Sequence, residues 1–477
     1  MILKQILEPK LAHYAYLIGC QETGSAIIID PQRDIDRYIG VAQQHGLHIE
    51  AAADTHIHAD YLSGVPQFAN REGITVYASD EGDESWKFEW LRDSTCRCKL
   101  LKHGDRIEVG RIVLEVMHTP GHTPEHISFL ITDTVRDAAT PVGLLTGDFV
   151  FVGDVGRPDL IEVALEQPGE ALRSAEVLFG SLQMFKQWSP TLMLWPGHGA
   201  GSACGRSMGS LPISTVGYEL ATNPSIRAAR ERSEFIDYIL DGQPEAPPYF
   251  ARMKQLNRLG PPVLAEWPRP QQVDMDAFQA RLADAECTVI DTRSWEDFRA
   301  GHLPGSLFIP LTSAFSTLVA SYVSPESRVS FIVDPQHLDE VVRHCIRVGI
   351  DRLDAYVIPD QFPNRAASNG QLASVTEIAM ADLPARLKDP GTLPVDVRRS
   401  SELIPKPPVP GARNLAHALL GGRHTELPPD RELYVYCNSG NRSRYATALL
   451  ASKGYTVTHV TGGIEAWMQL NPPPPGG

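Results

Sequence analysis

The stretch THIHADYLSG, residues 55–64, gathers side chains that could bind a metal ion. His56 and His58 lie one residue apart, Asp60 continues the same alternation, and Tyr61 follows. Alternate side chains of an extended segment point the same way, so we expect His56 and His58 to face one pocket. Imidazole and carboxylate groups are metal ligands, and the stretch therefore predicts part of a metal site.

Three more candidate ligands lie in comparable settings farther along the chain. His122 lies in TPGHTPEH, Asp148 follows the apolar run GLLTG, and His198 lies in WPGHG. Each stands beside a glycine near the end of an apolar run. A single His-x-His pair is a weak signal, whereas four such segments in one domain favour a metal centre. The alternative interpretation is a set of buried histidines that are hydrogen-bonded within a core.

A cysteine near the other end of the chain carries a second chemical signal. In YVYCNSGNRSRYATALLASKGY, an apolar strand leads to Cys437, a tight polar loop follows, and a helix is expected from about Ser443. Loop N–H groups and the helix N-terminus would stabilise an anionic sulfur, and Arg442 adds positive charge. We predict catalysis by Cys437 and Arg442, against the alternative of a structural cysteine. The expected substrate-binding residues of this loop are Asn438, Ser439, Gly440, Asn441 and Ser443.

The elements that must position these residues are readable as apolar runs bounded by turn signals. In residues 1–245 the runs are short and β-rich, as in SAIIID (25–30), ITVYAS (74–79), IVLEVMHT (112–119) and LMLWPGHG (192–199). Polar groups at the ends of such strands lie where α/β proteins usually place their sites. Pro and Gly then become frequent, and we expect an inter-domain linker with one short helix at residues 246–264.

The rest of the chain contains an internal repeat. Residues 288–311, TVIDTRSWEDFRAGHLPGSLFIPL, and residues 393–419, LPVDVRRSSELIPKPPVPGARNLAHAL, share one skeleton. Each has a strand that ends in Asp-x-Arg, an acidic residue four positions beyond, and then Pro-Gly. In the second copy, Asp396 and Arg398 are expected to be scaffold. The repeat predicts two small parallel α/β domains, at 265–365 and 375–477.

The first copy of the repeat lacks the cysteine loop. Asp334, in IVDPQHLDEVV, stands at the position of the cysteine, no Gly-x-Arg follows, and the loop is two residues shorter. Cys345 falls inside the following helix and cannot replace the nucleophile. We predict that this middle domain is catalytically inactive and serves in packing or docking.

Composition excludes several classes of protein. A chain of 477 residues with a net charge of -15 is an unsuitable partner for nucleic acid or anionic membranes. The N-terminal sequence lacks the features of a signal peptide, and no apolar run is long enough to span a bilayer. The seven cysteines, among them Cys20 after an apolar strand, do not suggest a disulfide framework. We expect a cytoplasmic protein with free thiols. The sequence leaves open whether the chain forms a homo-oligomer.

The first 245 residues resemble the metallo-β-lactamase fold, an αββα architecture. Within it, the motifs THIHAD, TPGHTPEH, TGDFVF, GRPDL and STVGYELATNP are most similar to persulfide dioxygenases, which are relatives of glyoxalase II. The resemblance implies one Fe(II) per chain, bound by His56, His122 and Asp148. His58, Asp60, Tyr61 and His198 would then orient the ligands and the substrate. The resemblance also assigns substrate contacts to Arg157, in GRPDL, with a surface salt bridge as the alternative. Cys204, six residues past His198, is a second candidate for the substrate, with simple packing as the alternative.

Two imidazoles and one carboxylate leave three positions open on a six-coordinate iron, enough for dioxygen and a substrate sulfur. Zinc favours a tetrahedral site with one water, suited to hydrolysis. A second metal would need Asp60, residue 61, His198 and a bridging Asp148, and Tyr61 offers no nitrogen ligand. Many persulfide dioxygenases keep a histidine at this position, so Tyr61 departs from their pattern. We therefore expect a mononuclear iron site, with zinc as the less favoured metal.

Residues 375–477 resemble rhodanese, the sulfurtransferase fold, in which a loop of six residues beginning at Cys437 would carry a persulfide sulfur. Tyrosine phosphatases use a loop one residue longer. The whole chain resembles bacterial fusions of a persulfide dioxygenase with rhodanese domains. The resemblance implies oxidation of a small thiol persulfide by O2 to sulfite, with sulfur transfer that interconverts persulfide, sulfite and thiosulfate. The alternatives are a zinc thioester hydrolase of glyoxalase II type with an appended sulfurtransferase, and a non-enzymatic sulfur sensor or scaffold.

Overall fold

The computed structural model describes residues 1–165, 169–282, 286–361 and 372–472. The chain divides into two compact units. The first comprises Met1–Ala265 and Arg347–Gly349, and the second comprises Glu266–Ile346 and Ile350–Gly477. The predicted ends of the repeat domains, residues 365 and 477, lie outside the described residues. In the described part of the chain, no helix is both long and apolar enough to cross a membrane.

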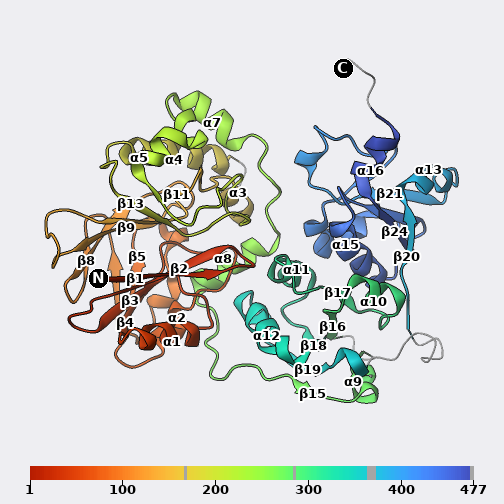
Figure 1. Cartoon of the computed structure of the whole chain (residues 1–477), viewed down its shortest axis with the longest axis horizontal. Helices are drawn as coiled ribbons and strands as arrows, with labels where there is room; N and C mark the ends of the chain where they lie inside the picture. Colours follow the sequence, from red (N-terminus) through yellow and green to blue (C-terminus); the bar gives the residue numbers. More distant parts are fainter. Residues whose placement is uncertain (166–168, 283–285, 362–371, 473–477) are drawn as a thin grey trace. The chain divides into compact units, whose positions relative to one another are not determined.

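The first unit is built on two six-stranded sheets (Figure 1). The first sheet has, in spatial order, β1 (Ile2–Glu8), β2 (His13–Gly19), β3 (Ser25–Ile29), β4 (His48–Ala53), β5 (Thr75–Ser79) and β6 (Cys98–Leu101). The second sheet has β14 (Ser214–Thr215), β13 (Met193–Pro196), β10 (Gly143–Gly147), β9 (Ile127–Asp133), β8 (Ile112–His118) and β7 (Arg106–Val109). A small ribbon consists of β11 (Val150–Phe151) and β12 (Asp154–Val155). The four strand runs expected from the sequence all coincide with strands.

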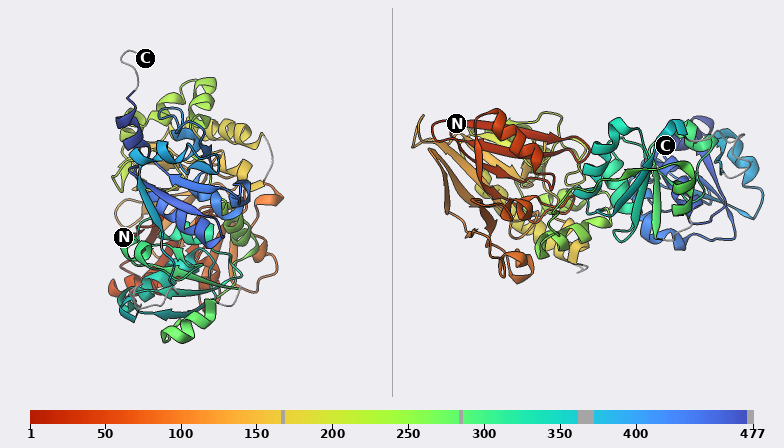
Figure 2. Two further views of the ribbon diagram at one scale, coloured as in Figure 1. Left: turned by 90° about the vertical axis from the view of Figure 1, so that its right-hand side faces the viewer. Right: turned by 90° about the horizontal axis from the view of Figure 1, so that it is seen from below.

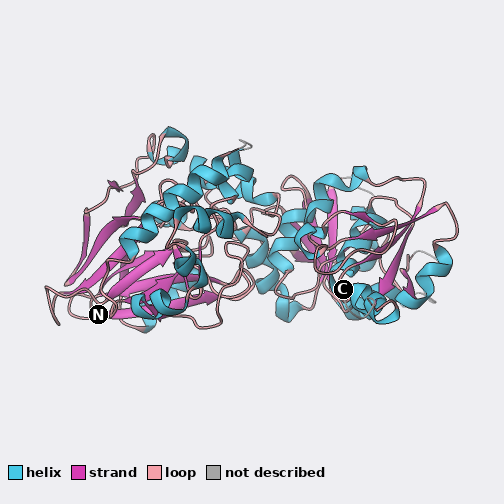
Figure 3. Ribbon diagram, turned by 90° about the horizontal axis from the view of Figure 1, so that it is seen from above, coloured by secondary structure: helices cyan, strands magenta, loops and turns pink. Residues whose placement is uncertain are grey.

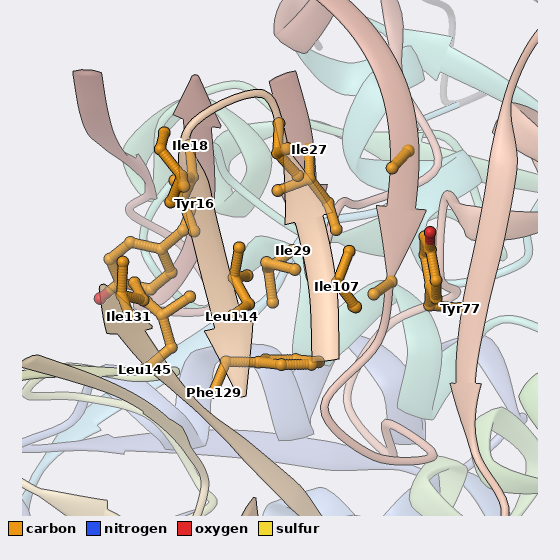
Figure 4. Close-up of a cluster of buried hydrophobic side chains, with 14 of the residues drawn as sticks. Tyr16, Ile18, Ile27, Ile29, Tyr77, Ile107, Leu114, Phe129, Ile131 and Leu145 are labelled. Carbon is orange, nitrogen blue, oxygen red and sulfur yellow. The ribbon is translucent and has the colours of Figure 1, made fainter. Parts of the chain in front are cut away.

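Both faces of the first sheet are buried, and β3 illustrates why its sequence is a continuous apolar run. Ile27 and Ile29 point into the core shared with the second sheet, whereas Ala26 and Ile28 point to the other face. Successive side chains of a strand alternate between faces, so a strand covered on both sides needs apolar residues throughout. Figure 4 shows the inter-sheet core, in which Phe129 of β9 packs near the β3 isoleucines.

Helices cover the outer faces of the two sheets (Figures 2 and 3). The helices of this unit are α1 (Asp36–Gln44), α2 (Val65–Ala69), α3 (Leu160–Leu165), α4 (Glu170–Phe185), α5 (Val216–Thr222), α6 (Pro224–Ala228), α7 (Arg232–Leu240) and α8 (Tyr249–Leu259), with 3-10 turns η1 (Glu84–Trp86) and η2 (Glu89–Leu91). Tyr38 of α1 and Phe68 of α2 pack on the first sheet, and Leu178 and Leu182 of α4 pack on the second. The expected αββα architecture is thereby confirmed.

The short helix expected in the linker exists as α8, and it packs within the first unit. Asn257 of α8 donates from Nδ2 to the carbonyl oxygens of His58 and Tyr61, at 2.8 and 2.7 Å. Its Oδ1 accepts the N–H of Ser63 at 2.9 Å. The histidine-rich loop lies outside the strands, so its backbone groups have no partners in a sheet, and the Asn257 side chain supplies three of these hydrogen bonds. The residues expected to be a linker therefore support the candidate metal loop.

The second unit holds two five-stranded parallel sheets with the same strand order, which confirms the repeat. The first sheet has β15 (Gln271–Gln272), β19 (Leu353–Val357), β18 (Arg328–Ile332), β16 (Cys287–Asp291) and β17 (Leu307–Phe308). The second has β20 (Thr376–Ala379), β24 (Val457–Thr461), β23 (Glu432–Tyr436), β21 (Thr392–Asp396) and β22 (Arg413–Asn414).

Each sheet of the second unit carries its own helices (Figure 1). The first group comprises α9 (Met275–Leu282), α10 (Trp295–Ala300), α11 (Phe315–Tyr322), α12 (Leu338–Arg347), η3 (Pro335–His337) and η4 (Pro359–Gln361). The second comprises α13 (Leu383–Arg386), α14 (Leu420–Arg423), α15 (Asn441–Ser452), α16 (Gly463–Leu470), η5 (Met380–Asp382), η6 (Ser400–Glu402), η7 (His417–Leu419) and η8 (His424–Glu426).

The Asp-x-Arg motifs are scaffold in both copies. Arg398 donates from Nε and Nη2 to the carboxylate of Asp396, at 3.0 and 2.6 Å, and both side chains are fully buried. Arg293 and Asp291 repeat this geometry with the same two distances. A planar guanidinium that binds a carboxylate through two parallel bonds fixes the turn after each strand.

The two copies differ at the end of the strand that precedes the loop. In the middle domain, Asp334 follows β18, and its carboxylate accepts the N–H of Gln336 at 3.0 Å, which starts the turn η3. Cys345 lies buried inside α12. Strand register places Val333, and not Asp334, at the position of Cys437, because Ile332 pairs with Asp291 as Tyr436 pairs with Asp396. The prediction that Asp334 stands at the cysteine position is therefore wrong by one residue, and Asp334 caps the turn that follows.

Candidate functional site

The histidine-rich loop begins where β4 ends. Residues 54–62 form no strand, so the expected extended alternation of His56 and His58 is wrong. The two imidazole rings still lie 4.2 Å apart between centroids, but they face different partners. His56 Nε2 lies 3.8 Å from Asp148 Oδ2, whereas His58 Nε2 lies 3.2 Å from Asp30 Oδ1. The loop turns between the two histidines, and a turning backbone does not preserve the two-residue period of a strand.

Three buried donors converge beside the ends of β4 and β10. The ligand atoms of His56, His122 and Asp148 lie within 4.8 Å of one another. His122 Nε2 is 3.5 Å from Asp148 Oδ2, and that carboxylate oxygen has no hydrogen-bond partner among the residues described. Buried polar atoms normally have a partner, and a carboxylate oxygen facing two imidazole nitrogens fits a divalent metal ion.

Neighbouring groups fix the orientation of both imidazoles. His122 Nδ1 donates to the carbonyl oxygen of Arg157 at 3.0 Å, so its Nε2 keeps a free lone pair directed toward Asp148. His56 Nδ1 lies 2.9 Å from Thr55 Oγ1. Partners of this kind set the tautomer and the angle of metal-binding histidines.

The protonation states also suit metal binding. Burial lowers the pKa values of His56 and His122, which keeps both imidazoles neutral. Burial alone would raise the pKa of Asp148, but the neighbouring imidazoles, His198 first, hold it well below its usual value. Metal ligands must be neutral imidazoles and ionised carboxylates, and the direction of all three pKa shifts favours that state.

Glycines allow the backbone to come close to the three donors. A Cβ on Gly156 would lie 1.8 Å from the carbonyl oxygen of Asp148 and 3.0 Å from His122 Cβ. A Cβ on Gly197 would lie 2.7 Å from Asp148 Oδ1. Side chains at these positions would displace two of the three donors, which explains the glycines beside the motifs.

The second candidate site is the loop between β23 and α15. Cys437 is buried, and its Sγ accepts the N–H of Gly440 at 3.2 Å. Gly440 has a φ of 108°, a conformation that favours glycine, and it directly precedes α15. The sulfur therefore accepts one backbone N–H beside the N-terminus of a 12-residue helix, where negative charge is stabilised.

Comparisons with known proteins agree with this geometry. Residues 9–201 match the family described as the metallo-beta-lactamase superfamily, and residues 274–374 and 379–470 each match the rhodanese-like domain. The crystal structure of a metallo-beta-lactamase from Staphylococcus aureus is 36% identical in sequence, with a TM-score of 0.66. The alignment covers 75% of this chain and 98% of that one. The chain belongs to the metallo-β-lactamase superfamily.

Relatives with curated names match the metallo-β-lactamase domain. "Persulfide dioxygenase ETHE1, mitochondrial" of Bos taurus is 28% identical over 247 residues, which are 50% of this chain and 79% of the relative. The Mus musculus protein of the same name is 28% identical over 240 residues, with the same coverage. The fusion of this domain to two rhodanese-like domains is the architecture expected from the sequence.

A second cluster of donors adjoins the first in the metallo-β-lactamase domain. The ligand atoms of Asp60, His198 and Cys204 lie within 4.8 Å of one another. His198 Nδ1 is 2.7 Å from Asp148 Oδ1, and its Nε2 is 3.0 Å from Asp60 Oδ2. Burial opposes charge on His198, but these two carboxylates raise its pKa to about 10. Burial raises the pKa of Cys204 well above its usual value, so that thiol stays protonated.

His58 and Tyr61 belong to a third group, which includes a histidine that sequence reasoning missed. Tyr61 Oη lies 2.8 Å from His13 Nε2, and the Tyr61 ring stacks on His58 at 4.5 Å between centroids. Burial alone would lower the pKa of His58, but Asp30 and Asp54 raise it to about 9. His13 belongs to no recognisable sequence motif. Asp30, at the end of SAIIID, had the same strand-end signal as Asp148 and could have been found.

Another missed residue lies inside a motif that was quoted. His126 is the second histidine of TPGHTPEH, and its Nε2 accepts the N–H of Asp148 at 3.0 Å. Its Nδ1 lies 2.9 Å from Thr119 Oγ1. Burial lowers the pKa of His126 to about 3, so it stays neutral and holds the backbone of Asp148.

Arg157 forms a salt bridge with Asp159, as one of its two interpretations expects, but its own side chain is buried rather than at the surface. Its guanidinium donates to both carboxylate oxygens of Asp159, at 3.0 and 2.6 Å. It also donates to the carbonyl oxygens of Ala203 and Pro244, at 3.2 and 2.6 Å. These acceptors occupy most of its donors, and its carbonyl oxygen holds His122. The geometry therefore favours a structural role over the predicted substrate contact.

Arg442 of the rhodanese loop is held by a carboxylate. Its Nη2 donates to Glu402 Oε2 at 2.7 Å, and its Nη1 donates to Oε1 at 2.5 Å. Glu402 is the acidic residue that the repeat places four positions beyond Asp-x-Arg. Asn438 donates from Nδ2 to Glu465 and accepts at Oδ1 from Lys406, whereas Ser443 Oγ lies 3.6 Å from Cys437 Sγ. Ser439 and Asn441 are the other residues between Asn438 and Ser443 that were expected to bind the substrate.

Proposed function

We propose that this chain oxidises a low-molecular-weight thiol persulfide with O2 to sulfite at a single iron ion bound by His56, His122 and Asp148. The balanced reaction is RSSH + O2 + H2O → RSH + HSO3⁻ + H⁺. The observation that carries the proposal is the converging donor set, with an unpartnered Asp148 oxygen facing two imidazoles. Relatives named persulfide dioxygenase support the choice of reaction.

Two imidazoles and one carboxylate are the ligand set of non-haem iron oxygenases, and they would leave three positions open on a six-coordinate iron. Bound iron would supply the redox chemistry by which O2 oxidises the terminal sulfur. The residues of the chain do the positioning. Arg157 and Thr55 orient the two imidazoles, His126 fixes the backbone of Asp148, and the burial of all three donors limits the access of water.

We further propose that Cys437 carries sulfane sulfur in the second reaction. A persulfide on Cys437 would transfer its outer sulfur to sulfite: Cys437–S–S⁻ + SO3²⁻ → Cys437–S⁻ + S2O3²⁻. The Gly440 N–H and the N-terminus of α15 stabilise the thiolate that leaves. Linking the two domains raises the concentration of sulfite near the site that consumes it. All seven cysteines are free thiols, which fits the reducing, cytoplasmic setting that we expect.

The test is elemental analysis of the full chain purified without added metal, together with oxygen uptake on glutathione persulfide. We expect one iron per chain and oxygen uptake in the wild type. His122→Ala should lose both, whereas His103→Ala, an exposed histidine on the same domain, should keep both. Stoichiometric zinc, with no oxygen uptake after loading with iron, would reject the proposal.

One observation favours a second candidate, a zinc-dependent thioester hydrolase. Asp60, His198 and Cys204 offer oxygen, nitrogen and sulfur donors beside Asp148, whose carboxylate lies between the two donor sets. Two-metal sites clamp the attacking and leaving oxygens of hydrolysis. Two zinc ions per chain and hydrolysis of S-lactoylglutathione would establish this alternative. One iron per chain would exclude it.

A further inference from the structure

A continuous row of hydrogen-bonding groups leads from Cys437 to Glu377, whose side chain is partly exposed. Ser443 Oγ lies 3.6 Å from Cys437 Sγ and 2.9 Å from His459 Nε2. His459 Nδ1 lies 2.8 Å from Glu377 Oε1. Ser443, the last residue of the cysteine motif, and His459, which lies outside the motif in β24, are both fully buried. A nucleophile, a hydroxyl, an imidazole and a carboxylate therefore follow one another, each within hydrogen-bonding reach of the next.

The middle domain supplies the groups that hold the far end of this row. Trp295 of α10 donates from Nε1 to Glu377 Oε1 at 2.8 Å. Arg299, one turn later, pairs through Nε with Glu377 Oε2 at 3.0 Å. Both rhodanese-like domains lie in the same compact unit. The domain that lacks a nucleophile thus contacts the carboxylate at the far end of the row, and the Trp295 ring also lies 5.3 Å from the His459 ring between centroids.

The direction of each hydrogen bond follows from the chemistry of the partners. A carboxylate only accepts, so His459 Nδ1 carries a proton and donates it to Glu377. In neutral His459, Nε2 then has a lone pair that accepts the Ser443 hydroxyl proton. In protonated His459, Nε2 donates to Ser443 Oγ and also lies 3.1 Å from the Gly440 carbonyl oxygen, which accepts. The Ser443 hydroxyl can then donate to the sulfur or to the Gly440 carbonyl oxygen, which lies 2.9 Å from its Oγ.

We propose that Ser443, His459 and Glu377 form a proton relay for Cys437, and that Trp295 and Arg299 of the inactive domain hold the relay in place. The S–H bond of Cys437 breaks and its proton passes to Ser443 Oγ. The original hydroxyl proton of Ser443 passes to His459 Nε2. The products are a thiolate that accepts a hydrogen bond from Ser443 and an imidazolium paired with Glu377. Return of the proton is the reverse of the same steps.

Several charged groups act on His459. Burial lowers its pKa, so it is neutral before it takes the proton, while Glu377 and the Gly440 carbonyl act in the opposite direction. Arg444 also disfavours the charged form, and its guanidinium lies over the Trp295 ring at 5.8 Å. A negative charge developing on Cys437 would offset these effects. His459 and Glu377 act through Ser443 and are therefore positioning residues rather than groups that touch the substrate.

The inference rests on the proposed sulfur transfer, so its test measures the thiol separately from the reaction. The rate of alkylation of Cys437 by iodoacetamide is measured in the full chain from pH 5 to 10 by mass spectrometry of its peptide. Thiosulfate sulfurtransferase activity is measured in parallel. Wild-type alkylation with no transferase activity would reject the proposed function while leaving the relay testable.

The variants are His459→Gln, Glu377→Gln and Trp295→Phe. We expect the loss of the proton acceptor to lower the alkylation rate at pH 7 about tenfold, which corresponds to about one pH unit or 1.36 kcal/mol. We expect an upward shift of about this size in the alkylation midpoint of His459→Gln and Glu377→Gln. Trp295→Phe keeps an aromatic ring but removes the donor to Glu377, and a smaller upward shift is expected.

The matched control is Tyr322→Phe. Tyr322 of α11 donates from Oη to the carbonyl oxygen of His417 at 3.1 Å, so it also bonds the second rhodanese-like domain but does not touch the relay. Its alkylation midpoint should equal that of the wild type. If His459→Gln and Glu377→Gln keep the wild-type midpoint, or if Tyr322→Phe shifts it as much as Trp295→Phe does, the relay is rejected. Should Trp295→Phe fail to fold, the Glu377→Gln midpoint decides.

Discussion

Replacing Gly156 by alanine should empty the metal centre without touching a metal-binding side chain. The added Cβ would lie 1.8 Å from the carbonyl oxygen of Asp148, whereas such contacts essentially never fall below 3.0 Å. Residue 156 and the backbone of Asp148 must therefore separate by about 1.2 Å. His122 Cβ, at 3.0 Å from the new methyl group, must move as well. Ligand positions in metal sites tolerate about 0.2 Å, so two of three donors would leave their places.

The size of the effect follows from this displacement. Overpacking of a buried site costs about 1–3 kcal/mol of unfolding free energy. For a domain of this size, a cost of about 2 kcal/mol lowers Tm by roughly 4–8 °C. Metal affinity should fall at least as much as when a supporting partner is lost, about 10–100-fold. Elemental analysis measures the metal content, and differential scanning calorimetry measures Tm. Oxygen uptake on glutathione persulfide measures the activity that depends on the metal.

Gly180→Ala is the matched control. Gly180 is exposed in α4, and a Cβ there would meet nothing within 4 Å. Alanine is about 1 kcal/mol more favourable than glycine in a helix, so Tm should rise by roughly 2–4 °C with unchanged metal content. A Gly156→Ala protein that keeps the metal content and oxygen uptake of the wild type would refute the reasoning.

Three further predictions concern the second unit. Cys437→Ser should abolish thiosulfate sulfurtransferase activity and leave oxygen uptake intact, because the two sites lie in separate domains; loss of oxygen uptake would contradict this. Burial raises the pKa of Cys345, so this thiol should resist iodoacetamide at pH 8 in the native chain and react only after denaturation; labelling as fast as that of Cys437 would contradict it. Burial alone would raise the pKa of Glu377, but its bonds to Trp295 and His459 lower it below 4.5. The stabilisation that ionised Glu377 gives to the folded chain is therefore complete above pH 4.5, and it is lost as the pH falls below that value. The Tm of Glu377→Gln should lie roughly 2–4 °C below that of the wild type at pH 7, for about 1 kcal/mol, and approach it at pH 4; a constant difference would argue against an ionised Glu377.

The candidate residues that sequence predicted best are those whose role is set by their immediate neighbours. Cys437 lies at the end of a strand and before a helix because the apolar run, the glycine at residue 440 and the helical segment are contiguous. Asp148 likewise follows directly after the apolar strand β10. The repeat was visible because Asp-x-Arg fixes a turn through a bond between residues two positions apart.

The prediction for the pair of histidines failed for the opposite reason. Whether His58 shares the pocket of His56 depends on a turn in the loop and on Asp30, which lies 28 positions earlier. Arg157 also had two interpretations, and only the acceptors around it, one of them at Pro244, decided between them. His13 gave no local signal and reaches Tyr61 only because β2 and the histidine-rich loop meet in the folded domain.

By itself, the sequence determined the fold class, the repeat, the strand-end positions of the donors and the loop around Cys437. These features depend on side-chain periodicity and on short backbone segments, whose geometry is set by residues a few positions apart. Only the tertiary structure decided which donors converge, which carboxylates hold them, and that Glu377 meets Trp295 and His459, each 82 positions away. Contacts at such separations depend on strand order and on the packing of whole elements, and a linear pattern of residue types does not specify either.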